Sequence, residues 1–237
     1  MAVLVIRRDD NFSQRLRYAG VEVVNLELVA TEVLDNFGEF ENVIADLAPY
    51  DGIFFTSPVA AEVFVEQVKA PIKPTIYALG NRAIGVLTRA GFVVKSISNA
   101  NTAEEMITGF GGDEFAGKKL LFVRGEQSMR TIPEMLDRIA EVDEVAVYRT
   151  IDVPLADEVA REVTERLIKG DIEWTCFFSP SAVEAFEKRF GKADNVAAIG
   201  ETTAARARDL GLTVKLVASR ATNEVFAREL IERIKGV

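Results

Sequence analysis

Short apolar stretches alternate along the chain with longer segments in which apolar residues recur every three or four positions. The short stretches are rich in Val, Ile and Phe, which is typical of buried strands. Ten strands are predicted at Val3–Ile6, Val21–Leu26, Ile53–Thr56, Thr75–Leu79, Val93–Ile97, Lys119–Val123, Glu144–Tyr148, Thr175–Phe178, Val196–Ile199 and Val214–Val217.

The longer segments have the period of amphipathic helices. They include Pro58–Val68, Asn81–Ala90, Ala103–Phe110, Ile132–Ile139, Leu155–Lys169, Pro180–Phe190, Thr202–Leu210 and Asn223–Lys235. Gly91 and Gly211 follow predicted helix ends, where a left-handed residue is expected. Thr102 and Glu105 have the spacing of a capping box.

Two stretches of the chain resemble each other at a separation of about 120 residues. The first begins IFFTSPVAAEVF (53–64) and the second TCFFSPSAVEAF (175–186). The aligned pairs are Ser57 with Ser179, Pro58 with Pro180, Gly80 with Gly200, Gly91 with Gly211, Lys95 with Lys215, Thr102 with Thr222, and Glu104 with Glu224. Because there are only two copies, the pattern indicates a duplicated domain and not a solenoid.

Alternation of strands and helices predicts an α/β fold with parallel sheets covered on both faces. Five strands fall in residues 31–150, and the other five in residues 1–30 together with 151–237. We therefore expect two similar flavodoxin-like parallel-sheet lobes, with 31–150 inserted into a discontinuous outer lobe. The extended connectors near Leu28–Val33 and Arg149–Pro154 are expected to pair as a two-stranded β linker that permits hinge motion.

Composition and charge exclude several function classes. The chain has 28 Lys and Arg residues and 37 Asp and Glu residues, for a net charge of −9, which argues against nucleic-acid binding. The inserted lobe accounts for −7 of this charge (11 basic against 18 acidic residues). With no histidine and one cysteine, neither a transition-metal site nor Ser–His or Cys–His catalysis is expected.

The expected location is the cytoplasm. No apolar run approaches the roughly 20 residues of a membrane helix. The N-terminal segment MAVLVIRRDD lacks a basic region before its apolar stretch, and we interpret it as a strand and not a signal peptide. A single cysteine, Cys176, permits no internal disulfide.

Candidate chemistry lies where predicted strands turn into helices, since open parallel sheets bind ligands at the carboxyl ends of their strands. These turns offer free N–H groups and hydroxyls to a carboxylate or phosphate. The candidates are Thr56, Ser57, Asn81, Arg82, Arg124, Gly125, Ser179, Ser181, Gly200, Thr202 and Thr203. For any one turn, plain helix capping is the better interpretation. Five such turns facing one interlobe cleft favour anion binding.

Tyr148 closes an apolar strand just before the second connector. Its hydroxyl either points toward the ligand or belongs to a packing tyrosine, and the sequence leaves both interpretations open. Arg7 and Arg8 end the first strand and are further cationic candidates. The acidic pairs Asp9–Asp10 and Asp113–Glu114 are interpreted as solvated turns. No GxGxxG or P-loop motif follows a strand.

These motifs, in this order and over essentially the whole chain, resemble the uroporphyrinogen-III synthase family. The residues that carry the resemblance are Phe55–Pro58, Leu120–Phe122 with Arg124–Glu126, Val147–Thr150, Phe178–Val183 and Ile199–Ala204. The sequence departs from the family pattern at Val59, where some members carry a basic residue, and at Arg82–Ala83, where a threonine is frequent.

The resemblance implies that hydroxymethylbilane, a linear tetrapyrrole with eight carboxylates, is cyclised with inversion of ring D and loss of water. It implies no cofactor or metal, and a monomer that transiently meets the upstream hydroxymethylbilane synthase. Tyr148 matches the family tyrosine that assists departure of the hydroxyl, and the hydroxyl-bearing turn residues match positions that hold carboxylates. The alternative is a non-catalytic, two-lobed protein that binds or senses a tetrapyrrole or small anion.

Overall fold

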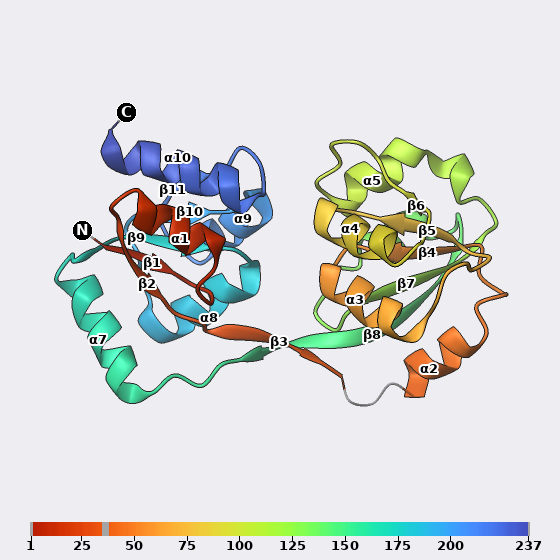
Figure 1. The fold of residues 1–237 in the computed structure, drawn as a ribbon, viewed down its shortest axis with the longest axis horizontal. Helices are drawn as coiled ribbons and strands as arrows, with labels where there is room; N and C mark the ends of the chain where they lie inside the picture. The colour runs from red at the N-terminus through yellow and green to blue at the C-terminus, as the bar shows by residue number, and fades with distance from the viewer. Residues whose placement is uncertain (1, 35–37, 237) are drawn as a thin grey trace. The chain divides into compact units, whose positions relative to one another are not determined.

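The computed structural model describes residues 2–34 and 38–236. The chain forms two compact units, an outer lobe of residues 1–30 and 151–237 and an inserted lobe of residues 31–150 (Figure 1). Residues 1, 35–37 and 237, which the predicted domain ranges include, lie outside the described residues. Each lobe is an α/β unit built on parallel strands, as the alternating pattern predicts.

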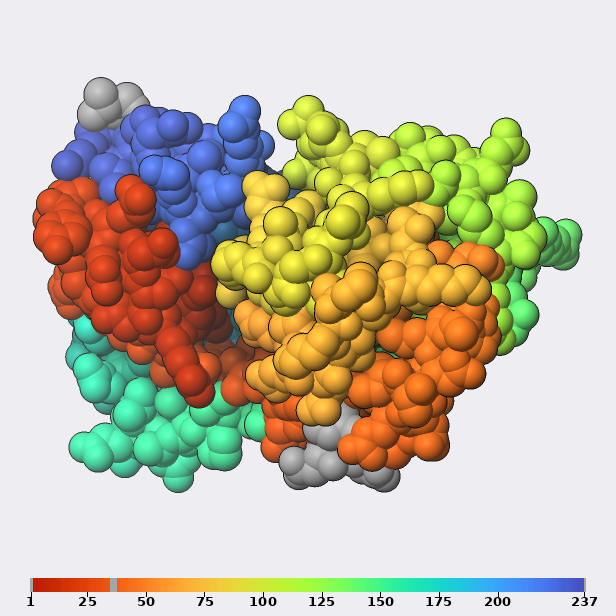
Figure 2. Space-filling view, turned by 45° about the vertical axis from the view of Figure 1, so that its right-hand side comes forward, coloured from red at the N-terminus to blue at the C-terminus, as the bar shows by residue number. Residues whose placement is uncertain are grey.

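The outer lobe contains a five-stranded parallel sheet with helices on both faces. Its order is β11 (Val214–Val217), β10 (Val196–Ala198), β9 (Ile172–Phe177), β1 (Ala2–Val5) and β2 (Glu22–Asn25). One face packs against α1 (Asn11–Tyr18) and α10 (Asn223–Lys235), whose red and blue surfaces adjoin in Figure 2. The other face packs against α7 (Asp157–Ile168), α8 (Pro180–Phe190) and α9 (Glu201–Asp209).

The inserted lobe repeats this design around a six-stranded sheet. Its order is β3 (Val29–Val33), β8 (Glu141–Asp152), β7 (Lys119–Gly125), β4 (Gly52–Phe55), β5 (Thr75–Ala78) and β6 (Val94–Lys95). The strands from β4 to β8 pair in parallel. One face packs against α2 (Gly38–Ala45), α3 (Pro58–Gln67) and α4 (Asn81–Arg89). The other packs against α5 (Ala103–Phe110), α6 (Thr131–Leu136) and Phe115, which follows the 3₁₀ turn η1 (Gly112–Glu114).

Apart from the additional β3, the two sheets have the same spatial order of strands, but the chain begins at a different strand in each. Read from β9, the outer lobe runs β9, β10, β11, β1 and β2, and the inserted lobe correspondingly runs β4, β5, β6, β7 and β8. In each sheet the first strand of this series is flanked by the second and the fourth. The repeated sequence therefore falls on equivalent elements, and β1 of the outer lobe is the counterpart of β7.

Burial on both faces explains why the central strands are uniformly apolar. All four residues of β1 and of β4 are buried. Phe12, Phe178 and Phe226 form one aromatic group with ring centroids 4.8–5.3 Å apart. Phe54 and Tyr77 stack at 5.0 Å in the other lobe. Burial of each such ring contributes about 1.5–3 kcal/mol relative to exposure.

The predicted helix signals are confirmed at three termini. Thr102 Oγ1 accepts from the Glu105 N–H at 3.1 Å, while the Glu105 carboxylate accepts from the Thr102 N–H, which completes the capping box. Gly91 and Gly211 follow α4 and α9 with φ values of +91° and +77°. Only a residue without a Cβ adopts this region readily.

β8 is longer than predicted, running from Glu141 to Asp152 and not from Glu144 to Tyr148. The extension has a partner in β3: the Leu34 N–H donates to the Val147 carbonyl at 3.1 Å, and the Val153 N–H donates to the Leu28 carbonyl at 2.9 Å. Tyr148 therefore lies within a strand and not at its end. Conversely, β6 shortens to Val94–Lys95 because it is an edge strand, and β5 is its one partner among the described strands.

Glu114 is not the solvated turn residue that the sequence suggested. The 3₁₀ turn η1 brings its carboxylate to the Tyr77 hydroxyl, which donates at 2.5 Å, and to Lys95 Nζ, which donates at 2.9 Å. These hydrogen bonds, from Tyr77 first and Lys95 second, lower the Glu114 pKa to about 2. The carboxylate thus ties η1 to β5 and β6.

Acidification is expected to destabilise the protein through Glu114. Because its pKa is lower in the folded state, its contribution is present above its ordinary pKa of 4.5 and is lost as the pH falls toward 2. Glu114→Gln should lower the urea midpoint at pH 7 and flatten its fall below pH 4.5. Asp113→Asn, at an exposed neighbour, is the control. An unchanged acid profile in Glu114→Gln would show that the interaction contributes nothing.

Candidate functional site

The predicted turn residues lie at the carboxyl ends of the parallel strands in their own lobes. In the inserted lobe Thr56 and Ser57 follow β4, Gly80 to Arg82 follow β5, and Arg124 and Gly125 end β7. In the outer lobe Ser179 and Ser181 follow β9, and Gly200, Thr202 and Thr203 follow β10. Each lobe therefore gathers its candidates at one edge of its sheet, which is where such sheets bind ligands.

The two Ser–Pro turns are helix caps. Ser57 Oγ accepts from the Ala60 N–H at 3.5 Å at the start of α3, and Ser179 Oγ accepts from the Ala182 N–H at 3.2 Å at the start of α8. Ser181 Oγ lies 3.0 Å from Ser179 Oγ. Ser57 and Ser179 therefore bind first-turn N–H groups of their own helices. Thr56, which directly precedes Ser57, is half-buried.

The two glycine turns differ from the serine turns because no side chain of the described residues caps α4 or α9. Gly80 precedes α4 with φ of +83°, and Asn81 and Arg82 are exposed. Gly200 precedes α9 in an extended conformation. Thr202 is exposed there, whereas Thr203 is only 4% exposed. First-turn N–H groups without a side-chain acceptor, at the positive end of a helix, suit an anion.

Arg124 is engaged within the protein. Its Nε lies 2.8 Å from Oε2 of Glu144, an ion pair without hydrogen-bond alignment, and its Nη1 donates to the carbonyls of Gly125 and Glu126 at 2.9 Å. Arg130 also binds Glu144, with Nη2 2.6 Å from Oε1. This geometry favours a structural role for Arg124, in which it holds the loop that follows β7.

Tyr148 lies in β8 directly beside Gly125. Its ring is half-buried and packs at the edge of the core between the sheet and α2, α3 and α4. A Cβ placed on Gly125 would be 2.5 Å from Tyr148 Cζ, so the ring occupies the space that a side chain would need. Within residues 2–34 and 38–236 the Tyr148 hydroxyl has no hydrogen-bond partner. The ring thus packs as a core residue does, and no described residue binds its hydroxyl.

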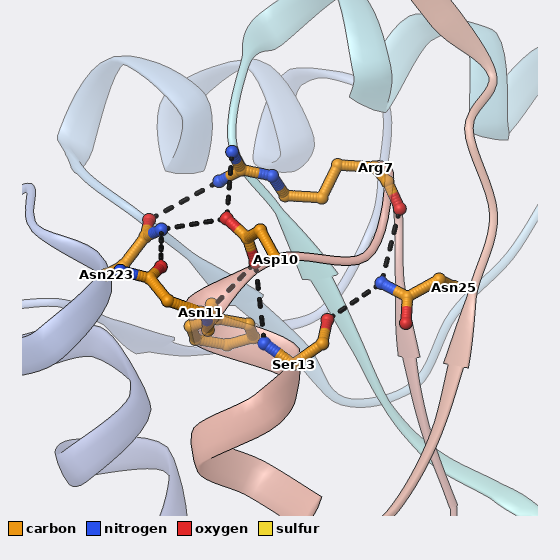
Figure 3. Close-up of polar contacts among 7 residues, drawn as sticks. Arg7, Asp10, Asn11, Ser13, Asn25 and Asn223 are labelled. Atoms are coloured by element: carbon orange, nitrogen blue, oxygen red, sulfur yellow. Dashed lines mark hydrogen bonds and ion pairs between the residues drawn. The ribbon is translucent and has the colours of Figure 1, made fainter.

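A polar network that the sequence did not predict lies at the carboxyl end of β1 (Figure 3). Arg7 Nη2 pairs with Asp10 at 3.0 Å, and Arg7 Nη1 donates to Asn223 Oδ1 at 3.3 Å. Asn223 Nδ2 donates to Asp10 at 2.9 Å. The Arg7 guanidinium lies 4.3 Å from the centre of the Phe178 ring. These contacts join the starts of α1 and α10 to the turn after β9.

Asp10 is therefore not the solvated turn residue that the sequence predicts. It is the N-cap of α1, where Oδ1 accepts from the N–H groups of Phe12 and Ser13. Asn25 Nδ2 extends the network by donating to Ser13 Oγ at 2.7 Å and to the Arg7 carbonyl at 3.3 Å. The sequence did contain a signal for the N-cap, since Asp10 lies shortly after an apolar strand and before an amphipathic stretch. No local pattern indicated that Asn223 and Asn25 would join this network.

Other sites of chemistry find no support in the described residues. They contain no group of three or more His, Cys, Asp or Glu side chains placed to hold a metal ion. Burial raises the pKa of the Cys176 thiol, which disfavours the reactive thiolate. No helix in the described ranges has the length and apolar character of a membrane span.

Comparisons with known proteins agree with one another. Residues 10–227 match the family described as uroporphyrinogen-III synthase HemD. The uroporphyrinogen-III synthase of Chlorobaculum parvum is 27% identical over 207 residues, which are 81% of this chain and 83% of that protein.

Two solved structures share the fold. A mutant uroporphyrinogen III synthase from Thermus thermophilus has a TM-score of 0.68 at 16% identity and covers 100% of both chains. A uroporphyrinogen-III synthetase from Helicobacter pylori has a TM-score of 0.67 at 17% identity and covers 98% of this chain and 99% of its own. At these identities the structures establish the α/β fold alone. The sequence match spans most of the chain, and the chain therefore belongs to the uroporphyrinogen-III synthase family.

Proposed function

We propose that this protein is a lyase that cyclises hydroxymethylbilane to uroporphyrinogen III. The observation that carries the proposal is the family match over residues 10–227. Tyr148 gives further support, because it stands at the position where the resemblance expects the catalytic group. No described residue forms a hydrogen bond with its hydroxyl. Tyr148 assists departure of the substrate hydroxyl as a hydrogen-bond donor or acid. The hydroxyl gains one proton and leaves as water, and the pyrrole N–H loses one proton as the azafulvene forms.

The other task of the protein is to hold the substrate so that its two ends react. Loss of the hydroxyl gives an azafulvene, which is attacked by the substituted carbon of ring D, and a spiro intermediate then rearranges to the inverted ring. Neither a metal nor a redox partner is required. Because the competing attack gives the type I isomer without enzyme, orientation of the chain ends accounts for most of the specificity.

The carboxylates of the substrate bind at the carboxyl ends of the sheets. The starts of α4 and α9 are the strongest candidates, because no described side chain accepts from their first-turn N–H groups. Asn81, Arg82, Thr202 and Thr203 line these turns. Ser57 and Ser179, which already cap their own helices, contribute less, and Ser181 and Thr56 add hydroxyls beside them.

Together with the reaction we propose a flavodoxin-like topology for each lobe, a two-stranded linker, a location and an oligomeric state. The strand order 2-1-3-4-5 of the outer lobe in its own chain order supports a flavodoxin-like assignment, extended to the inserted lobe by the equivalence of the two sheets. The pairing of β3 with β8 supports a two-stranded linker. The proposed setting is a cytoplasmic monomer that receives its unstable substrate from hydroxymethylbilane synthase.

A coupled assay tests this function. Purified protein is added to hydroxymethylbilane formed in situ, and the products are oxidised to porphyrins and separated into type I and type III isomers. We expect type III at a rate far above the uncatalysed reaction. Type I alone, with tetrapyrrole binding retained, would instead identify a non-catalytic binding or sensor protein.

A further inference from the structure

The strand that carries Tyr148 has an irregular register at this point. β7 and β8 pair residue by residue from Lys119 with Glu141 to Arg124 with Ala146, and the next pair is Gly125 with Tyr148. One extra residue, Val147, is thus accommodated in β8. Such a bulge re-aims the side chain that follows it. Val147 and Tyr148, consecutive residues that a regular strand would send to opposite faces, both pack against the same core cluster.

Gly125 provides the room that this re-aimed ring needs. A Cβ at Gly125 would meet Tyr148 Cζ at 2.5 Å, Cε2 at 2.6 Å and the hydroxyl oxygen at 2.9 Å. All three distances are below ordinary contact for a Cβ, so the ring has to move if the glycine is replaced. Gly125 is not left-handed, and its requirement is for space and not for backbone freedom.

Beyond the end of β7, residues of the following loop continue the hydrogen bonding to β8. The Glu126 N–H donates to the Tyr148 carbonyl at 2.9 Å. The side-chain amide of Gln127 then takes the place of a strand residue: its Oε1 accepts from the Thr150 N–H at 3.0 Å, and its Nε2 donates to the Thr150 carbonyl at 3.5 Å. Ser128 Oγ closes the loop by accepting from the Gly125 N–H at 3.0 Å.

We propose that Gly125 and Gln127 are positioning residues that set the place of the Tyr148 ring and hydroxyl. Gly125 fixes how closely the ring approaches β7, and Gln127 fixes the backbone of β8 two residues beyond the tyrosine. The inference rests on the proposed function, because it assigns these residues a role in a reaction that Tyr148 assists. A displacement of about 1 Å is enough to lower a catalysed rate by ~100-fold.

Kinetics of matched variants give the first readout. Gly125→Ala and Gln127→Ala should lower kcat by about 10- to 100-fold and leave KM within about twofold, since the ring is displaced without loss of substrate contacts. Gly112→Ala, where a Cβ meets nothing within 4 Å, controls for the glycine change. Glu126→Ala controls for the loop, because Glu126 is exposed and its hydrogen bonds within the described residues come from its backbone.

A second readout follows the ring itself. The chain has four tyrosines, so 3-fluorotyrosine labelling gives few ¹⁹F signals, and Tyr148→Phe identifies the one from Tyr148. This signal should shift in Gly125→Ala and Gln127→Ala and stay in place in both controls. Unshifted signals with normal kcat in Gln127→Ala would overturn the inference, even if Gly125→Ala fails to fold. Shifted signals with normal activity in both Gln127→Ala and Tyr148→Phe would instead overturn the role proposed for Tyr148.

Discussion

Tyr148→Phe is expected to lower kcat by about 100-fold or more while leaving the fold and its stability nearly unchanged. A positioned acid contributes about 10²–10⁴-fold to a rate, and phenylalanine removes only the hydroxyl. That hydroxyl has no hydrogen-bond partner in the described parts of the chain, so its loss leaves no protein group unsatisfied. The ring remains to fill the space beside Gly125. Steady-state kinetics and urea unfolding measure the two effects.

Tyr50→Phe is the matched control for this experiment. Tyr50 lies in the same lobe, and its hydroxyl donates to Asp143 at 2.8 Å. The same chemical change should here lower the free energy of unfolding by ~1 kcal/mol and leave kcat unchanged. A normal kcat in Tyr148→Phe, like that expected for Tyr50→Phe, would show that Tyr148 is a packing residue.

Gly200→Asn is expected to stabilise the protein and to raise KM by about tenfold. Asn is a better N-cap than Gly, so its side chain should occupy the first-turn N–H groups of α9 and stabilise the helix by a few tenths of a kcal/mol. The site tolerates it, because Gly200 is extended and a Cβ would meet only the Ala221 Cβ, at 3.8 Å. A carboxylate that relies on these N–H groups loses charge-assisted hydrogen bonds of about 1.5 kcal/mol or more.

The control adds the same cap to a helix outside the candidate site. No side chain among the described residues caps α7, and its N-cap residue Ala156 is exposed. Ala156→Asn should raise the melting temperature without changing KM. Gly200→Asp extends the test by adding a charge, and it should raise KM further than Gly200→Asn. A normal KM in a stabilised Gly200→Asn variant would show that α9 does not hold the substrate.

Local signals in the sequence were sufficient for much of the fold. The apolar strands and the Ser–Pro starts of α3 and α8 follow from periodicity and capping chemistry, which depend on neighbours along the chain. The length of β8 could not be predicted in this way, because its pairing with β3 joins residues more than 100 positions apart. The bulge at Tyr148 could not be predicted either, because it depends on the pairing of two strands.

In the candidate site, too, features set by local sequence could be predicted and features set by distant partners could not. The sequence placed Gly200 and Ser179 at the carboxyl ends of strands, which local pattern is able to predict, but it wrongly ended the strand of Tyr148 at that residue. It did not show which turns are already satisfied: Arg124 is bound by Glu144, a residue of the next strand. The partners of Glu114 and Asp10 were hidden in the same way, since Tyr77 and Asn223 come from distant segments. From sequence alone, a charged side chain at a turn is interpreted as solvated, because its partner from a distant segment is known only from the fold.

The most direct test of the account is the product of a single turnover. The protein in excess is mixed with hydroxymethylbilane, and the isomers are quantified for the natural chain and for Tyr148→Phe. We expect the natural chain to give type III alone, and Tyr148→Phe to form type III so slowly that type I from the uncatalysed reaction accumulates. Type I from the natural chain, or type III at full rate from Tyr148→Phe, would contradict the account.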